Sequence, residues 1–559
     1  MADCKQVAIA EEYKELIFSS RGTEQELQER FGADCVFRIT EGISIAYFYY
    51  PNLQEEGLEL DYNMIPKCYG LLQSPAEQAQ ILQVRSNPNY EFYGQGVLIG
   101  FVDTGIQYTH SAFSYEDGST RIVAIWDQTI QTGTTPDGFT FGSEYKREQI
   151  EEALRSEVPE SVVPSIDTIG HGTAMAGVAV GRESEQDGFS GAAPLAEIAV
   201  VKLKEAKSYL RESYQIAEDV PCYAESDILL GVKYLYELAA NMQKPLVLCI
   251  GVGTNAGSHK GLLPLSLYLD QIARVIENCV VVAGGNEGNR GHHYNGRAEG
   301  ENYTEVELLV GEEKNGFSME LWGRGESIFT LEIITPSGEV IPKIPSRIWY
   351  RYKYDLYYEG GAIFVEYRLL ERRSGQMLIF LRFQAPSPGV WRFRVYEVYK
   401  GNGEFDIWLP IDPFISSETY FLRPEVAVTI CEPGNAEIVI TTGVYDYVSD
   451  SLYIYSSRGY SADGRVKPEL VAPGVQVLAP DTNNGYLEST GSSIGAAITA
   501  GACALFLESA LRNGFAAIST SEIKRLLTGG AKRMNIVYPN NEWGYGALDV
   551  YRAFNLLRR

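Results

Sequence analysis

The spacing of apolar residues changes along the chain, and one stretch is typical of an α/β domain. Between about residues 94 and 300, short runs rich in Val, Ile and Leu alternate with helical patterns; the runs are GVLIGFVD, EIAVVKL, PLVLCIG and CVVVAGG. Runs that are apolar on both faces are typical of buried parallel strands. Between them, ESDILLGVKYLYELAANM has apolar residues at helical spacing, with Ser226 and Asp227 as candidate caps. We therefore predict a parallel sheet with helical crossovers.

A second pattern occupies about residues 301–430. The helical periods disappear there, and segments such as FSMELW, AIFVEYRLL, MLIFLRF and VWRFRVYEV alternate in polarity or are aromatic and β-branched. Turn signals such as SPG, GNG and EGG separate them. This pattern favours an antiparallel β-sandwich of the jelly-roll kind. Because the α/β pattern resumes after about residue 435, the sandwich is predicted to interrupt one domain.

These patterns predict four segments. Residues 1–73 form a small α/β unit with a helix-like stretch, EQELQERFG, and a strand-like one, GISIAYFYY. The main α/β domain takes residues 74–300 and 431–559, and the inserted sandwich takes residues 301–430. A chain of 559 residues is too long for one ordinary core, which agrees with this division.

The composition narrows the classes of function. The formal net charge is −26 without a long basic run, so a nucleic-acid backbone or an anionic membrane would be repelled. The eight cysteines are scattered without a CxxC pair, which argues against a zinc ribbon and favours a reducing compartment. The beginning, MADCKQVAIAEEYKELIF, shows no secretory signal, and the apolar stretches are shorter than a membrane span. We expect a soluble protein with no export signal and neither a nucleic-acid nor a membrane partner.

Three short glycine-containing segments carry candidate chemistry. Asp103 ends the strand in GVLIGFVDTGI, His171 lies in DTIGHGTAMAGVAVG, and Ser493 opens a helix in STGSSIGAAITAGACAL. In parallel sheets, ligands bind beyond the carboxyl ends of strands, where Asp103 is placed. A serine hydroxyl becomes a good nucleophile when an imidazole removes its proton. A carboxylate orients that imidazole and stabilises its cation.

With these segments the sequence resembles the subtilisin family of serine proteases. The DTG, GHGT and GSS blocks occur in that family's order, and GAAPLAEIAVVKL and SSRGYSADGRVKPELVAPG also match its pattern. The resemblance implies a three-layer fold and a serine endopeptidase with Asp103, His171 and Ser493 as its triad. It implies that Asn286, in VVVAGGNEGN, donates to the oxyanion. The substrate pocket would be lined by Gly251, Val252, Gly253, Ala283, Gly284 and Gly285.

The nucleophile block departs from the family's Gly-Thr-Ser-x-Ala-x-Pro. Here it reads Gly491, Ser492, Ser493, Ile494, Gly495, Ala496, Ala497. Ser492 in place of threonine keeps a hydroxyl, whereas Gly495 and Ala497 change the packing at the start of the helix. The departure puts the rate and the helix entry in question, but not the nucleophile.

The overall arrangement resembles a narrower group, the clostridial Csp germination proteases. Those proteins have a short N-terminal prodomain, no export signal and a jelly-roll insertion. The resemblance implies a cytoplasmic or spore-associated protein whose polypeptide substrate is the precursor of a cortex-degrading hydrolase. It also implies that the chain cuts off its own prodomain, which stays bound as an inhibitor. We expect that cut between Pro66 and Pro75, with Gln73–Ser74 favoured; no cofactor or metal ligand is implied, and structural calcium stays open.

Two other readings remain open at the level of sequence. Some Csp proteins are pseudoproteases, so the chain could be a catalytically silent signalling or binding protein, although all three triad residues are retained here. The aromatic stripe RIWYRYKYDLYY could serve a carbohydrate-binding sandwich, although a sheet face explains it as well. His292 and His293 look like a metal pair, but no carboxylate spacing supports one.

Overall fold

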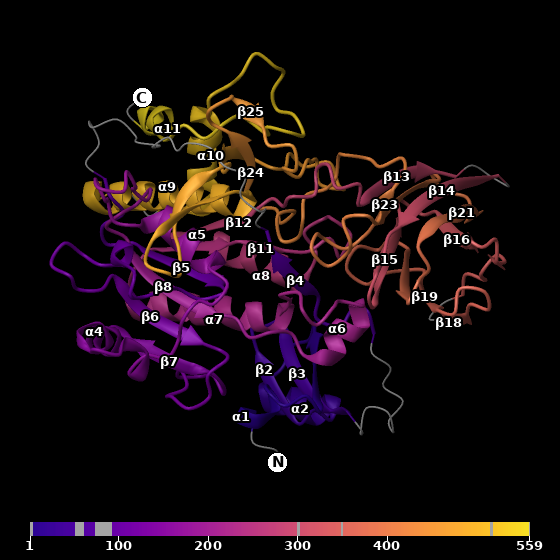
Figure 1. Ribbon diagram of the computed structural model, residues 1–559, viewed down its shortest axis with the longest axis horizontal. Coiled ribbons are helices and arrows are strands. Elements are labelled where there is room, and N and C mark those ends of the chain that lie inside the picture. Colours follow the sequence, from indigo (N-terminus) through magenta and orange to yellow (C-terminus); the bar gives the residue numbers. More distant parts are fainter. Residues whose placement is uncertain are drawn as a thin grey trace.

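A computed structural model describes residues 4–50, 61–72, 92–298, 302–347, 350–514 and 518–557. Three units are visible in Figure 1. A small N-terminal unit lies at the bottom in indigo, a two-sheet unit made of β13 to β23 lies at the right, and the catalytic unit fills the left and centre.

The catalytic unit is built on a nine-stranded sheet in the order β25-β24-β12-β10-β5-β8-β6-β7, with β26 beside β24. The parallel strands are β5 (Leu98–Asp103), β6 (Ile122–Asp127), β8 (Glu197–Lys202), β10 (Leu246–Ile250), β12 (Asn278–Ala283), β24 (Ile440–Asp446) and β26 (Leu470–Pro473). Two edge strands run antiparallel, β7 (Ser143–Lys146) and β25 (Ser451–Leu452). The predicted α/β fold with a largely parallel sheet is confirmed.

Helices cover both faces of this sheet. Along β5, Ile99 and Phe101 point into one core and Leu98 and Val102 into the other, as the two-residue period of a strand requires. The first core contains residues of α5 (His171–Val180) and α9 (Ser492–Asn513), and the second those of α7 (Glu225–Asn241) and α8 (Pro264–Ala273). The other helices are α4 (Arg147–Arg155), α6 (Ser208–Tyr214), α10 (Thr520–Gly530) and α11 (Val550–Leu556).

Helix α9 is the one helix of the described segments that is long and apolar enough to cross a membrane. It is packed against α5, β12, β10 and β24, and almost all of its apolar window is buried inside the protein. Burial on every side explains an all-round apolar helix without a membrane.

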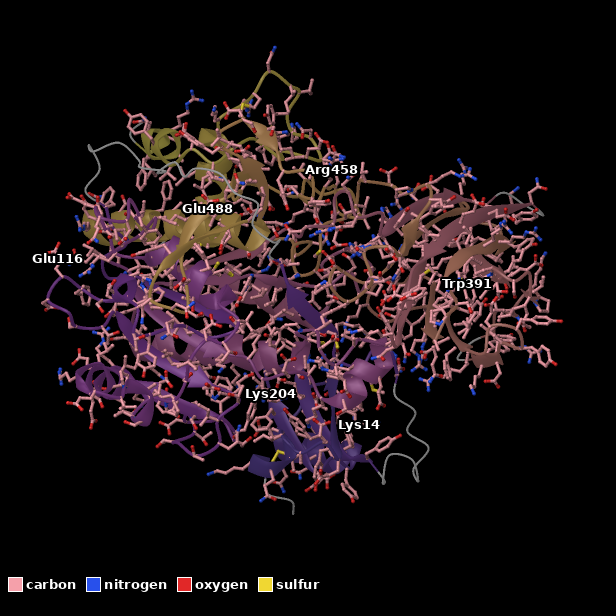
Figure 2. All side chains as sticks on the ribbon, in the orientation of Figure 1. Lys14, Glu116, Lys204, Trp391, Arg458 and Glu488 are labelled. Carbon is pink, nitrogen blue, oxygen red and sulfur yellow. A yellow bond between two sulfur atoms is a disulfide. The ribbon has the colours of Figure 1, made fainter. Side chains whose placement is uncertain are left out.

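The two-sheet unit consists of two antiparallel sheets that face each other. One has the order β13-β22-β15-β20-β19-β18 and the other β17-β16-β21-β14-β23. Their bounds are β13 (His293–Arg297), β14 (Tyr303–Val310), β15 (Gly316–Gly323), β16 (Ile328–Ile334), β17 (Val340–Ile341), β18 (Tyr350–Asp355), β19 (Ala362–Arg368), β20 (Leu378–Gln384), β21 (Gly389–Tyr399), β22 (Glu404–Trp408) and β23 (Tyr420–Phe421). A separate apolar core that includes Trp391 fills the space between them (Figure 2). The jelly-roll connectivity stays a prediction.

The N-terminal unit is a three-stranded sheet, β1-β3-β2, with two helices. Its elements are α1 (Cys4–Val7), β1 (Tyr13–Phe18), α2 (Glu24–Phe31), β2 (Cys35–Arg38) and β3 (Ser44–Tyr49). One face of the sheet joins the core beneath α7, and Lys207 of the catalytic unit binds the buried Glu15 at 3.1 Å. Lys14 and Lys204 lie near this contact in Figure 2.

A disulfide joins Cys4 of α1 to Cys35 of β2. The scattered cysteines favour a reducing compartment, which stays a prediction; the other six are free and buried. The pair was not foreseen because 31 residues separate its members, and connectivity cannot be deduced from such spacing.

Candidate active site

Asp103 and His171 come together at the carboxyl end of the sheet. Asp103 is the last residue of β5, His171 is the first of α5, and both are almost fully buried. His171 Nδ1 lies 2.7 Å from Asp103 Oδ1, which also accepts a hydrogen bond from the Thr104 amide. This arrangement fixes the imidazole ring and leaves its Nε2 for a proton.

Ser493 is the second residue of α9 and is fully buried. Three buried polar atoms have no hydrogen-bond partner among the described residues: Ser493 Oγ, His171 Nε2 and Asp103 Oδ2. Buried polar atoms are rarely left unpaired, and such exceptions are characteristic of catalytic groups. Each of the three predicted triad residues carries one such unpaired atom, which favours their assignment to a catalytic site.

Glycine beside the imidazole allows close packing. A Cβ at Gly172 would lie 2.2 Å from the Gly105 carbonyl oxygen, and one at Gly251 would lie 2.2 Å from Met175 Sδ and 3.1 Å from His171 Cε1. Real carbon contacts are longer, so any larger residue would displace the ring or its support. Steric crowding therefore explains why glycine occupies positions 172 and 251, in the GHGT and GVG segments.

Asn286 lies next to the nucleophile helix. Its Oδ1 accepts a hydrogen bond from the Ser492 amide at 3.0 Å, so its Nδ2 is the group left to donate to an oxyanion. Gly285 N donates to Ser492 Oγ at 3.1 Å, and Gly284 N donates to the Thr442 carbonyl. Ala283 ends β12 just before them. These bonds hold the segment against α9 and β24.

The extended segment that ends at Leu72 lies between two strands of the catalytic unit. Strand β4 (Cys68–Leu71) pairs antiparallel with β11 (Val252–Gly253) on one side and with β9 (Tyr223–Ala224) on the other. Just beyond it, Leu72 N donates to the Gly251 carbonyl at 3.2 Å. The Leu72 carbonyl oxygen lies 3.4 Å from Ser493 N. A peptide carbonyl is thus placed at the nucleophile, in the extended form in which sheet edges bind peptides.

The Leu72 side chain shows what one pocket accepts. It is 2% exposed, and a Cβ added to Gly253 would lie 2.8 Å from its Cδ1. Gly251, Val252 and Gly253 therefore line the bound strand, and the small edge makes room for a leucine side chain. That Ala283, Gly284 and Gly285 line the same pocket stays a prediction.

Glu432 supports this edge and was not singled out from the sequence. Its backbone exchanges two hydrogen bonds with Thr254, immediately after β11. Its carboxylate accepts from Ser266 Oγ at 2.7 Å and from Gly261 N at 2.9 Å, and burial raises its pKa to about 7. The sequence CEPGN gives no indication that its glutamate has a role, because the burial of Glu432 is apparent only in the folded structure.

The two neighbouring histidines bind different carboxylates. His292 Nδ1 lies 2.5 Å from Glu287 Oε2, and His293 Nε2 lies 3.0 Å from Asp406 Oδ1. Within the described residues, no group of three or more His, Cys, Asp or Glu side chains is placed to hold a metal ion. The His292–Glu287 pair precedes β13, whereas His293 and Asp406 lie on the paired strands β13 and β22 of the two-sheet unit.

Comparison with known proteins identifies the class. The subtilase family pattern (peptidase S8) matches residues 94–314 and 401–546, which is most of the chain. The chain belongs to the subtilase family of serine peptidases. Residues 315–400, which make up most of the two-sheet unit, lie outside both matched stretches.

Among solved structures, the chain is similar to the CspB protease of Clostridium perfringens, with 31% identity and a TM-score of 0.75. The match covers 84% of this chain and 95% of that one. It is also 30% identical over 142 residues to the serine protease AprX of Bacillus subtilis, and 29% identical over 135 residues to the membrane-bound transcription factor site-1 protease of Mus musculus. These two matches span only 31% and 12% of the relatives' lengths.

Asn286→Ala tests the proposed oxyanion donor. Removing one such donor costs about 10²–10³-fold in turnover, and we expect a loss of that size here. Because Oδ1 also holds the Ser492 amide, the rate of cleavage should be measured together with the melting temperature. A folded Asn286→Ala protein that cleaves at the wild-type rate would remove Asn286 from the mechanism.

Proposed function

We propose that the chain is a serine endopeptidase that uses Asp103, His171 and Ser493, and that its first substrate is its own chain, cut after Leu72. The observation that carries the proposal is the position of the Leu72 carbonyl oxygen, 3.4 Å from Ser493 N. A segment held in the cleft by its own chain has a very high effective concentration, which favours cleavage in cis.

The chemistry follows from the geometry. Ser493 Oγ attacks the Leu72 carbonyl carbon while His171 Nε2 takes the hydroxyl proton, and Asp103 stabilises the resulting imidazolium. Ser493 N and Asn286 Nδ2 donate to the oxyanion. His171 then gives the proton to the departing amine of Gln73, which leaves an acyl ester on Ser493. Water, activated by the same imidazole, hydrolyses the ester and restores the serine.

The favoured bond shifts by one residue from the sequence-based expectation. The sequence favours Gln73–Ser74, a bond that lies outside the described residues, whereas the pairing of β4 with β11 brings Leu72 to the nucleophile. The proposed N-terminal unit therefore ends at Leu72, one residue before the expected boundary at 73. Strand register decides the position, because each residue along an extended strand advances it by about 3.3 Å.

The contacts of the N-terminal unit favour its retention after the cut. Tyr209 OH donates to the Glu15 carbonyl at 2.7 Å, and Lys207 binds Glu15 in a buried ion pair. The segment of residues 61–72 also contacts the two-sheet unit, since Tyr62 OH donates a hydrogen bond to Glu320 at 2.8 Å. We propose that the cut unit stays in place as an inhibitor and leaves the enzyme latent.

Self-cleavage is tested by the masses of the purified protein. We expect two fragments, one ending at Leu72 and the other beginning at Gln73, that separate under denaturing conditions and elute together in gel filtration. Fragment ends determined by mass spectrometry distinguish this bond from Gln73–Ser74. A protein that stays full length, yet cleaves other polypeptides, would contradict the proposal.

A germination role is the proposed biological setting. It is supported by the similarity to CspB and by the resemblance of the sequence to the Csp group. In that setting the chain is a cytoplasmic or spore-associated protease that converts the precursor of a cortex-degrading hydrolase. The test is incubation of the purified protein with such a precursor, where a shorter, active hydrolase is expected. An intact precursor in the presence of a self-cleaved enzyme would refute this role while leaving the peptidase assignment unaffected.

A further inference from the structure

The third residue before the proposed cleaved bond, Gly70, lies beneath the loop between β22 and β23. A Cβ at Gly70 would lie 2.9 Å from Ile411 Cδ1 and 3.1 Å from two ring atoms of Phe414. Non-bonded carbon atoms pack at about 3.5–4.0 Å. Both side chains of the loop would therefore have to retreat together to admit even a methyl group.

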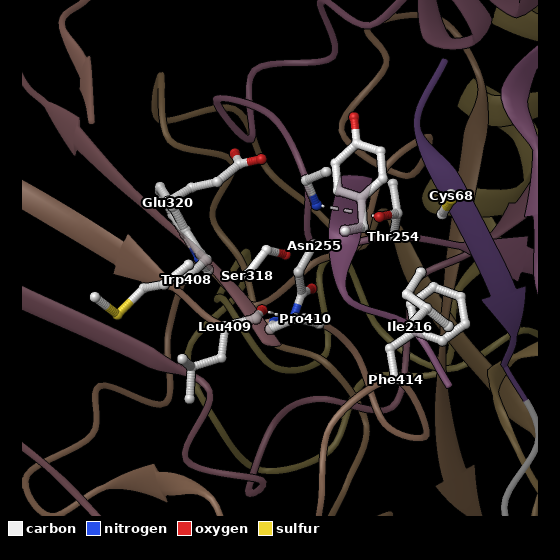
Figure 3. A pocket seen from close by; sticks show the side chains of 13 residues that line it. Cys68, Ile216, Thr254, Asn255, Ser318, Glu320, Trp408, Leu409, Pro410 and Phe414 are labelled. Atoms are coloured by element: carbon white, nitrogen blue, oxygen red, sulfur yellow. Dashed lines mark hydrogen bonds between the residues drawn. The ribbon is translucent and has the colours of Figure 1, made fainter. Parts of the chain in front are cut away.

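Neither side of this contact has an easy way to move. Ile411 is fully buried and Phe414 is 7% exposed. Figure 3 shows Phe414 beside Ile216, with the strand that carries Cys68 next to them. The cavity lined by Phe414, Ile216 and Cys68 holds only about 30 Å³, enough for one water molecule but not for a displaced ring. Gly70 is itself paired with Gly253 of β11, so the bound strand is held in place.

The need for glycine at this position is steric and not conformational. Gly70 is not among the glycines with positive φ, so its backbone conformation is open to any residue. An alanine would meet no backbone strain there, and only its Cβ contacts with Ile411 and Phe414 oppose it. This separates Gly70 from glycines such as Gly285, whose φ is +108°.

We propose that Ile411 and Phe414 are specificity-determining residues that close the third subsite to every residue except glycine. The inference rests on the proposed self-cleavage after Leu72 and extends it to substrates in trans. The neighbouring subsites complete the pattern: Tyr69 is fully buried, Leu71 is half-buried, and Leu72 is buried. The substrate class is an extended polypeptide that reads aromatic, glycine, a variable residue and leucine before the cleaved bond.

The test introduces substitutions in the bound strand and at Ile411 and Phe414, the two loop residues that cover Gly70, in the full-length chain. Refolding from denaturant starts the reaction, and the fraction cut after Leu72 is followed by electrophoresis. Gly70→Ala should slow cleavage about 10- to 100-fold, the effect of overpacking a well-filled site. Ile411→Val removes the Cδ1 atom, and Phe414→Leu removes the ring. Combined with Gly70→Ala, these two changes should bring the rate to within about threefold of the Ile411→Val/Phe414→Leu protein.

Leu71→Ala is the matched control, since it also alters the bound strand but at a half-buried position. We expect it to be cut within about twofold of the wild-type rate. Cleavage of Gly70→Ala at the wild-type rate would overturn the proposal, and so would a combined variant that remains as slow as Gly70→Ala. If Gly70→Ala fails to fold, recovery of folding and cleavage in the combined variant supports the proposal that Ile411 and Phe414 exclude larger residues. Continued misfolding of the combined variant refutes that proposal. A wild-type chain that stays uncut would refute self-cleavage itself.

Discussion

Ser493→Ala is expected to remain a single uncut chain. In subtilisin, where the effect was measured, loss of the triad serine lowers turnover by roughly 10⁶-fold, and we expect a loss of the same order. A self-cleavage that takes seconds in the wild type would then take on the order of ten days. The fold should persist, because Ser493 Oγ has no hydrogen-bond partner to lose among the residues that the structure describes.

Ser226→Ala is the matched control for this experiment. Ser226 lies in α7 and, like Ser493, is fully buried with a hydroxyl that has no hydrogen-bond partner within the described part of the chain. It should be cut at the wild-type rate, as judged by intact mass after refolding. A Ser493→Ala chain with a fragment ending at Leu72 would show that another nucleophile, or a contaminating protease, makes the cut.

Asp103→Asn should slow cleavage by up to about 10⁴-fold, as the same change does in a trypsin-like triad. The Thr104 amide needs an acceptor at the Oδ1 position, so the amide oxygen should stay there and keep the His171 Nδ1 contact. The substitution removes the negative charge that stabilises the imidazolium. The rate of the chemical step should therefore fall, while the strand that ends at Leu72 stays bound beside Ser493. The measurement is the single-turnover rate of the Leu72 cut after refolding.

Asp127→Asn provides the control for this change. Asp127 also ends a parallel strand, β6, and is fully buried, but its carboxylate binds Ser165 and Thr129. It is expected to affect the melting temperature and not the rate of the folded protein. Equal rates for Asp103→Asn and wild type would contradict the assigned role of Asp103.

The reactive residues could be predicted because short-range chemistry marks them. Asp103 follows an apolar run, and His171 and Ser493 each stand among glycines at the start of a helix. The parallel sheet was visible for a similar reason, since strands buried on both faces are continuous apolar runs. In each case the signal lies within about ten residues of the feature it predicts.

The bound strand could not be placed in this way. Leu72 reaches the nucleophile through pairing of β4 with β11, whose residues are distant in the sequence, and CYGL has no alternation that sets a register. The Cys4–Cys35 disulfide and the burial of Glu432 have the same origin, because each depends on segments that meet only in the folded chain. Gly70 looks like an ordinary turn residue until Ile411 and Phe414 are seen above it.

The interruption of the catalytic unit by the two-sheet unit sets an order in time. Asp103 and His171 precede the two-sheet unit, whereas Ser493 follows it. At roughly 5–20 residues per second, a ribosome needs on the order of tens of seconds to travel from Asp103 to Ser493. Throughout that interval the nascent chain has a base and a substrate strand but no nucleophile. A polypeptide that has not reached Ser493 therefore cannot cut itself or its neighbours, and proteolysis can begin only after that residue has been synthesised.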